Sequence, residues 1–176
     1  MRDRKLLNSE LKRINPEQYR QAPETGTVVV LDNIRSAHNV GSVFRSSDAF
    51  RIDRIYLCGI CACPPSAEIH KSALGAEDSV RWEHRDDTVA LVRELRSGGY
   101  TVVSVEQTQG AVQLQDFRRE RGRRYAFVFG NEVEGVQQSV VDESDSCIEI
   151  PQFGTKHSLN ISVCAGIILW ATRPQD

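Results

Sequence analysis

Five residues near the beginning of the chain, Thr27-Val-Val-Val-Leu31, form an apolar and mostly β-branched run. A run of this kind is typical of a strand that is buried on both faces of a sheet. Further strand-like runs follow, with stretches of helical character between them. This alternation predicts an α/β fold, a mainly parallel sheet with helices on both faces. The further runs cover residues 54–58, 100–105, 124–129 and 146–150.

Helices are predicted where apolar spacing coincides with capping or breaking residues. We expect one helix over residues 39–50 and a second over 66–74. A third is expected to be capped by Asp86 or Asp87 and ended by Gly98-Gly99. The last helix is expected over 158–172, with Ser158 as its cap.

The chain has 176 residues, of which 40% are hydrophobic and 26% are charged. This size and composition suit one soluble domain with a real core. We expect that domain over residues 25–176, preceded by a short helical extension over 1–24. Within the extension, leucines near helical spacing predict an amphipathic helix over 3–14, stopped by Asn15-Pro16.

The compartment is expected to be the cytoplasm. No run reaches the ~18 apolar residues of a membrane span, and the first residues lack the apolar core of a signal peptide. The five cysteines are expected to be reduced thiols. A zinc-binding interaction domain around Cys58, Cys61, Cys63 and His70 is an alternative, but a second ligand pair is missing, so we predict no metal.

Positive charge is uneven along the chain. The net charge of −2 does not indicate nucleic-acid binding, yet five arginines lie between residues 118 and 124. Solvated surface is the simpler interpretation of any one cluster. A local phosphate-binding surface is the other interpretation. It would combine this cluster and a second basic cluster at the amino end, residues 2–13, with Arg35, Arg51, Arg54, Lys156 and Arg173.

Ligands of open α/β sheets bind beyond the carboxyl ends of the strands. The glycine-rich dinucleotide fingerprint and the phosphate loop are both absent, which disfavours a nicotinamide cofactor or a nucleoside triphosphate. Backbone groups at Gly130, Ile150 and Leu159 would suit a purine or an amino-acid-like ligand. The expected strand-end segments are 32–33, 106–108, 130–132 and 151–154.

Two polar residues beside apolar runs also point to a site. Glu132 follows a strand and needs a cation or several donors if it is buried. Arg45 is its expected partner, either in a structural ion pair or aimed by the carboxylate at a substrate oxygen. Asn160 opens an otherwise apolar helix, where an amide is either a satisfied structural group or a functional one.

Three segments carry these residues: Asn39-Val-Gly-Ser-Val-Phe-Arg45, Phe129-Gly-Asn-Glu-Val-Glu-Gly135 and Ile150-Pro-Gln-Phe-Gly-Thr-Lys-His-Ser-Leu-Asn160. In this order they resemble the three signature motifs of the SpoU (TrmH-like) ribose methyltransferases of the SPOUT class. The resemblance covers roughly residues 27–172.

The resemblance implies a Rossmann-like, mainly parallel sheet with a C-terminal trefoil knot, an exception to the usual absence of knots. It also implies a homodimer, S-adenosyl-L-methionine as cofactor and methylation of a ribose 2′-hydroxyl in RNA. We expect tRNA as the substrate. The alternatives are the same chemistry on ribosomal RNA and a catalytically silent, dimeric RNA-binding module.

The resemblance also assigns residues. Arg45 is the implied catalytic group, as a base or as an electrostatic stabiliser, and the second role is physically easier for a guanidinium with a pKa of about 12.5 or above. The charge pattern adds Arg35, Lys156 and Arg173, which we expect to contact RNA together with Arg45. The other residues tied to activity are Asn39, Glu132, Ser158 and Asn160. The cofactor residues are Glu106, Thr108, Gly130, Asn131, Ile150, Gln152, Ser158 and Leu159.

Overall fold

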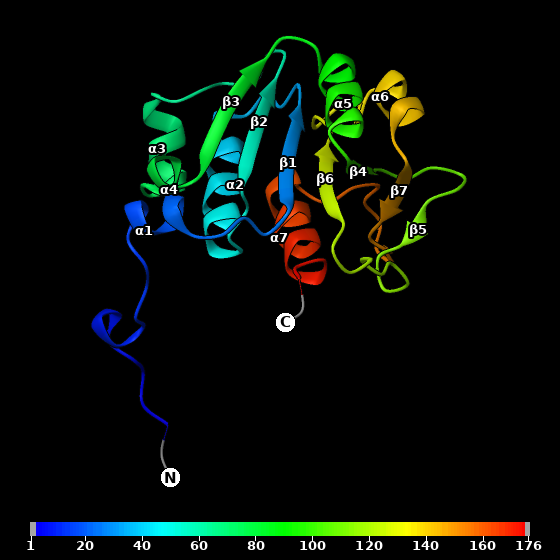
Figure 1. Ribbon diagram of the computed structural model, residues 1–176. Coiled ribbons are helices and arrows are strands. Elements are labelled where there is room, and N and C mark those ends of the chain that lie inside the picture. Colours follow the sequence, from blue (N-terminus) through cyan, green and yellow to red (C-terminus); the bar gives the residue numbers. More distant parts are fainter. Residues whose placement is uncertain (1–2, 175–176) are drawn as a thin grey trace.

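The computed structural model describes residues 3–174 and has a seven-stranded sheet at its centre (Figure 1). Every pair of neighbouring strands runs parallel, in the order β3-β2-β1-β6-β4-β7-β5. The predicted mainly parallel α/β fold is therefore confirmed. The strands are β1 (Thr27–Asp32), β2 (Arg54–Cys58), β3 (Arg81–Arg85), β4 (Tyr100–Val105), β5 (Val112–Gln113), β6 (Arg124–Phe129) and β7 (Ser146–Glu149).

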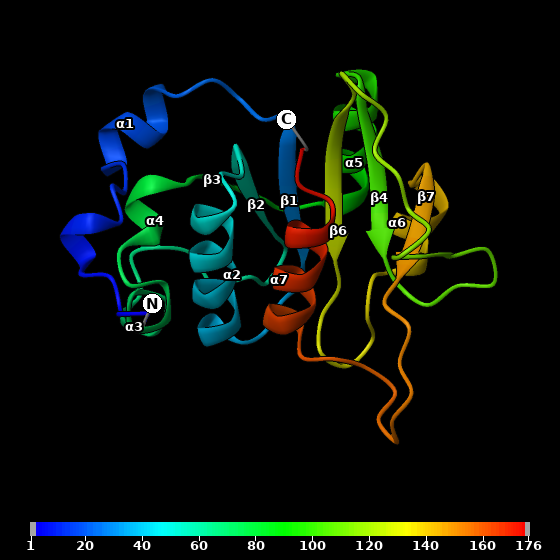
Figure 2. The same ribbon diagram turned by 90° about the horizontal axis from the view of Figure 1, so that it is seen from below.

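Helices cover both faces of this sheet (Figures 1 and 2). A short 3-10 helix, η1 (Asn8–Glu10), and α1 (Pro16–Gln21) precede the first strand. One face carries α2 (Ala37–Ala49), α3 (Ala67–Ala73), α4 (Ala76–Ser79) and α7 (Ile161–Ala171), and the other carries α5 (Thr88–Ser97) and α6 (Gln138–Glu143). Within residues 3–174, no helix combines the length and apolarity that crossing a bilayer requires.

Strand β1 shows how the sequence builds the two layers. Its side chains alternate, with Val29 and Leu31 packing toward α2 and α7, and Val28 and Val30 packing toward α5 and α6. All four are buried. The β-branched run is therefore buried on both sides, as the period of two in a central parallel strand requires.

The structure corrects the predicted amino-terminal helix over residues 3–14. Only η1 forms there, and Leu6 and Leu7 remain 61% and 66% exposed because no apolar face lies opposite them. Asn15 and Pro16 begin a helix rather than stop one. The Asn15 side chain accepts a hydrogen bond from the backbone N–H of Gln18 at 2.9 Å, and Pro16 takes the first helical position, where no N–H is needed.

Besides η1 and α1, four short elements were not expected from the sequence: α4, α6, β3 and β5. Strand β3, Arg81-Trp-Glu-His-Arg85, lies at the edge of the sheet and is mostly polar instead of forming an apolar run. An edge strand pairs with a neighbour on one side only and stays partly exposed, so its sequence lacks the apolar residues that mark a buried strand. The other strands and the helices α2, α3 and α5 lie where they were predicted.

Candidate functional site

A hollow of about 530 Å³ opens at the carboxyl ends of β4, β6 and β7. We call it the carboxyl-end hollow. Its volume is within the range of small-molecule sites, and its place is where open α/β sheets bind ligands. Most of the residues that the sequence marked for cofactor or catalysis line it. They are Glu106, Gly130, Asn131, Glu132, Ile150, Gln152, Ser158, Leu159 and Asn160.

A tight turn after β6 forms one wall of the carboxyl-end hollow. The backbones of Asn131 and Gly135 exchange two hydrogen bonds of 3.1 Å. The Asn131 side-chain oxygen accepts hydrogen bonds from the N–H groups of Val133 and Glu134, both at 2.9 Å. A Cβ atom on Gly130 would lie 1.9 Å from the carbonyl carbon of Gly135. The turn can therefore close only if residue 130 is glycine.

Glu106, at the end of β4, ties this turn to the sheet. Its carboxylate accepts hydrogen bonds from the N–H of Val136 at 2.9 Å and from its neighbour Gln107 at 2.8 Å. The Gln107 amide in turn donates to the carbonyl oxygen of His157 at 2.6 Å. Glu106 and Gln107 thus link the turn after β6 to the loop before α7.

Three side chains from distant parts of the chain meet at the mouth of the carboxyl-end hollow. The Nδ2 of Asn39, on α2, donates to Oε1 of Glu132 at 2.8 Å. The Nδ2 of Asn160 donates to Oδ1 of Asn39 at 3.2 Å. One residue from each of the three segments is therefore joined in a single chain of hydrogen bonds.

Glu132 is held as a carboxylate by neutral donors. Partial burial raises its pKa, but hydrogen bonds from Asn39 and from backbone N–H groups, including that of Arg35 at 3.3 Å, outweigh this and lower the pKa overall. The first turn of α2 also lies beside the carboxylate, where the positive end of the helix dipole favours negative charge. The carboxylate therefore carries its charge without an arginine partner.

The expected pairing of Glu132 with Arg45 is wrong. Arg45 lies on an exposed side of α2, and among residues 3–174 its guanidinium makes no hydrogen bond or ion pair. It does not line the carboxyl-end hollow of its own chain. Successive residues of a helix are rotated by about 100° around its axis. Asn39 occupies the side of α2 that faces the Glu132 carboxylate, and Arg45 therefore lies on another side.

Four more predicted site residues are not gathered at the carboxyl-end hollow. Thr108 lies outside its lining, because its carbonyl oxygen accepts from Ala111 in a turn that leads toward β5. Arg35 is exposed just before α2, and Lys156 is exposed in the loop before α7. Arg173 lies beyond the other end of α7.

Asn160, and not Ser158, caps the last helix. The Asn160 side-chain oxygen accepts from the N–H of Ser162 at 2.9 Å, and α7 begins at Ile161. Ser158 belongs to the exposed loop that runs along the hollow. The asparagine therefore does two things, since its oxygen caps α7 while its nitrogen reaches Asn39.

Sequence reasoning did not single out several further polar residues of the lining. Glu134, Glu149, His157 and Cys164 all line the carboxyl-end hollow. Their position in the turn after β6, at the end of β7 and around the cap of α7 was the signal that could have found them. Burial raises the pKa of the Cys164 thiol to about 11, so it stays protonated at neutral pH.

The carboxyl-end hollow is acidic. Its lining includes four glutamates, and none of the described residues that line it is a lysine or arginine. Such a site favours a ligand that carries positive charge. The glutamates are Glu106, Glu132, Glu134 and Glu149.

The cysteines that suggested zinc are packed into the core. Burial raises the pKa of the Cys58 and Cys61 thiols to about 12. The Cys61 sulfur accepts from the N–H of Ile34 at 3.1 Å and donates to the carbonyl oxygen of Leu31 at 3.3 Å. In the part of the chain that the structure describes, no group of three His, Cys, Asp or Glu side chains is placed to hold a metal ion.

Known proteins resemble this chain in sequence. Residues 26–170 match the SpoU rRNA Methylase family. The chain belongs to this family. It is 28% identical over 173 residues to the tRNA (guanosine(18)-2′-O)-methyltransferase of Aquifex aeolicus, which covers 97% of this chain and 78% of that protein. It is 29% identical over 152 residues to the 23S rRNA (guanosine-2′-O-)-methyltransferase RlmB of Neisseria meningitidis, over 86% of this chain and 60% of that protein.

A solved structure shares the fold of this SpoU-family chain. The AdoMet-bound rRNA methyltransferase of Sinorhizobium meliloti superposes with a TM-score of 0.78 and 27% identity, over 87% of this chain and 58% of that one. The chain thus spans about three fifths of the Neisseria and Sinorhizobium proteins, and four fifths of the Aquifex enzyme.

Proposed function

We propose that this chain is an S-adenosyl-L-methionine-dependent RNA methyltransferase that methylates a ribose 2′-hydroxyl. The observation that carries the proposal is the hydrogen-bonded chain Asn160–Asn39–Glu132 at the mouth of the carboxyl-end hollow. Membership of a methylase family supports it. Substitution of Asn39 by Ala removes both links, so methyl transfer should fall sharply while the fold persists.

The carboxyl-end hollow fits the proposed cofactor. When bound, the cofactor supplies an electrophilic methyl group on a positively charged sulfonium, which the four glutamates of the lining favour. The partly exposed side chains of Val105, Ile150 and Leu159 offer apolar walls for a purine. The residues proposed to hold the cofactor are Gly130, Asn131, Ile150, Gln152, Ser158 and Leu159, with Glu106 at the end of β4.

The proposed reaction needs a weak nucleophile, the ribose hydroxyl, to be aligned and relieved of one proton. We assign Arg45 to stabilise the developing alkoxide or the neighbouring phosphate, because a neutral guanidinium is costly. Glu132 and Asn39 orient the mouth of the site, and Asn160 and Ser158 shape the loop before α7. Arg35 and Lys156 are proposed to contact the RNA.

A homodimer completes this proposal. Helix α7 and the residue before its cap expose an apolar stripe at helical spacing, of Leu159, Val163, Ile167 and Trp170, with Trp170 55% exposed. Stripes of this kind mark protein interfaces. Helix α2 lies beside α7 (Figures 1 and 2), so a dimer formed through α7 would bring Arg45 of the partner subunit near the carboxyl-end hollow. The exposed place of Arg45 in the single chain supports action across the interface.

For the substrate we propose tRNA, with ribosomal RNA as the second candidate. The Aquifex relative is named for tRNA and the Neisseria relative for 23S rRNA, so homology favours neither strongly. Incubation with labelled S-adenosylmethionine and separated tRNA and ribosomal RNA, followed by mapping of 2′-O-methyl positions, decides between them. Label in neither fraction would count against the proposed activity.

A catalytically silent RNA-binding module is the alternative from another class. Titration calorimetry with S-adenosylmethionine distinguishes the two, since an enzyme binds the cofactor and a silent module does not. The acidic lining and the intact set of polar residues favour the enzyme.

Three further features belong to the proposal. A trefoil knot within residues 25–176 is what the family implies. Residues 1–24 would form a separate extension, which Tyr19 fastens to the core through hydrogen bonds to the carbonyl oxygens of Ser47 and Ile52. The cytoplasm is the proposed location.

A further inference from the structure

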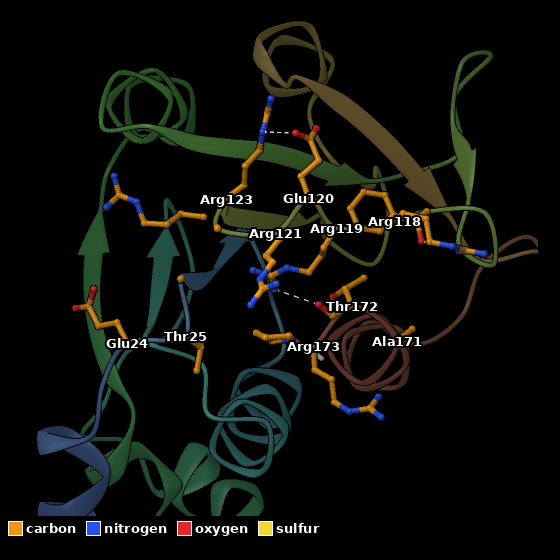
Figure 3. A pocket seen from close by; sticks show the side chains of 15 residues that line it. Glu24, Thr25, Arg118, Arg119, Glu120, Arg121, Arg123, Ala171, Thr172 and Arg173 are labelled. Carbon is orange, nitrogen blue, oxygen red and sulfur yellow. Dashed lines mark hydrogen bonds and ion pairs between the residues drawn. The ribbon is translucent and has the colours of Figure 1, made fainter. Parts of the chain in front are cut away.

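A second hollow, of about 1110 Å³, lies at the amino ends of β1 and β6, at the opposite end of the sheet from the carboxyl-end hollow. Figure 3 shows the residues that line it. We call it the arginine hollow. Three segments line it: residues 24–26 just before β1, residues 117–124 leading into β6, and residues 171–174 at the end of α7. Strand β6 has six residues, which at about 3.3 Å per residue sets the two hollows roughly 20 Å apart.

The arginine hollow is strongly positive in a chain whose net charge is −2. Six arginines line it against two glutamates, Glu24 and Glu120, an excess of four positive charges. The carboxyl-end hollow has the opposite sign. The arginines are Arg118, Arg119, Arg121, Arg123, Arg124 and Arg173.

Arg119 makes this a built surface rather than a group of solvated side chains. It is part-buried, lies with its guanidinium carbon 4.6 Å from the centre of the Tyr125 ring, and donates to the Thr27 hydroxyl at 2.7 Å and the Thr172 carbonyl oxygen at 3.1 Å. Among residues 3–174 it forms no ion pair, and burial lowers its pKa, which Tyr125 and the carboxylate of Asp53 offset only in part. A partly buried cation that is incompletely balanced is stabilised by an anion that completes the site.

The neighbouring arginines are presented outward with donors to spare. Arg118 donates only to backbone carbonyl oxygens, those of Gln115 at 2.6 Å and Phe117 at 2.8 Å. Arg173 lies over the Trp170 ring, with its guanidinium carbon 3.6 Å from the centroid. Arg121 makes no side-chain hydrogen bond or ion pair within residues 3–174, and Arg123 alone is paired with an acid, Glu120, at 2.7 Å. Each guanidinium has five N–H groups, so most remain available.

The arrangement suits an extended polyanion better than a single small anion. Figure 3 shows Arg119 and Arg121 in the middle of the hollow, with Arg118, Arg123 and Arg173 directed to different sides. Guanidinium groups spread in this way match successive phosphates, which they bind through paired hydrogen bonds. The volume also exceeds what one anion would fill.

We propose that the arginine hollow binds the sugar–phosphate backbone of the RNA substrate at a point distant from the methylated ribose. This inference rests on the proposed function, and it adds the surface that supplies affinity for the RNA substrate. The lining of the carboxyl-end hollow is acidic and repels phosphates, so a basic surface away from it would add attraction for RNA to that of Arg35, Arg45 and Lys156. An RNA that reaches both hollows must extend over about 20 Å, so a single nucleotide cannot occupy both.

The test compares a double variant, Arg118→Ala with Arg121→Ala, with a control of equal charge change, Lys71→Ala with Arg93→Ala on α3 and α5. Arg119 is left intact because it joins β1 to the end of α7. Binding of labelled tRNA and ribosomal RNA to the full chain is measured by fluorescence anisotropy at several salt concentrations. The double variant should bind RNA about tenfold more weakly, with a salt slope lower by about 1.5–2, while the control matches wild type.

The outcomes separate this inference from the proposed function. Cofactor affinity should be unchanged in the double variant, and methyl transfer should show a raised KM for RNA with unchanged kcat. Weakened RNA binding by the double variant supports the inference even if no RNA is methylated. Intact methyl transfer with equal affinity and salt slope in both variants overturns it. Displacement of RNA by polyglutamate as effectively as by unlabelled RNA would overturn it in favour of an acidic protein partner.

Discussion

Asn39 donates its side-chain N–H to Glu132 at 2.8 Å, although 93 residues separate the two in the chain. The contact joins the first turn of α2 to the turn after β6. It also sets a neutral amide, rather than an arginine, against the carboxylate. Within residues 3–174, the guanidinium of Arg45 makes no hydrogen bond or ion pair, as its proposed role toward a substrate requires.

The pKa of Glu132 gives a prediction for stability against pH. Because its pKa in the folded chain is below the ordinary value, its carboxylate stabilises the fold above the unfolded-state pKa of about 4.3, and this contribution is lost as pH falls through the folded pKa. In denaturant unfolding, the advantage of wild type over Glu132→Gln should therefore be largest near pH 7 and shrink below about pH 4. An Asn39→Ala variant should show a Glu132 pKa nearer its ordinary value by NMR titration. An advantage that stays constant across this range would contradict the assignment.

Gly130 and Gly154 offer a matched pair of substitutions. A methyl group on Gly130 would collide with the backbone of Gly135, whereas a Cβ on Gly154 meets nothing within 4 Å. Gly130→Ala should lower the free energy of unfolding by about 2 kcal/mol or more and the Tm by roughly 4–8 °C. Gly154→Ala should melt like wild type by circular dichroism. Equal melting of the two variants would show that the turn closes in another way.

The cap of α7 can be tested in the same manner. Asn160→Ala removes the acceptor for the Ser162 N–H and should cost about 1 kcal/mol. Ser158→Ala removes no hydrogen bond found among the described residues and should change stability by less than about 0.5 kcal/mol. Thermal melting measures both, and a larger loss for Ser158→Ala would restore the serine as the cap.

Arg45 is expected to act in chemistry and not in cofactor binding. Arg45→Ala should leave cofactor affinity by calorimetry nearly unchanged and reduce methyl transfer on the order of 10²-fold or more. Normal turnover by this variant would end the assignment. A rate that rises with pH without a plateau in wild type would disfavour an internal base of moderate pKa.

Mixed dimers test whether Arg45 acts across the interface. Arg45→Ala and Glu132→Ala chains, each inactive alone, are mixed and allowed to exchange subunits. Action across the interface should restore about one quarter of wild-type turnover, because half of the dimers are mixed and each has one complete site. If Arg45 acts within its own chain, no mixed dimer contains a complete site, so the mixture stays inactive.

The sequence alone predicted the central strands, three of the helices and the family. Runs such as Thr27–Leu31 record burial on both faces of a sheet, and caps such as Ser66 and Asp87 mark helix starts, because these signals are local. Contacts between distant segments leave no such local signal. That Glu132 meets Asn39 rather than Arg45 depends on the rotation of α2, and that Arg119 meets the end of α7 depends on how β1 and β6 lie together. Side-chain partners across a sheet are set by the packing of whole elements, which no short stretch of residues encodes.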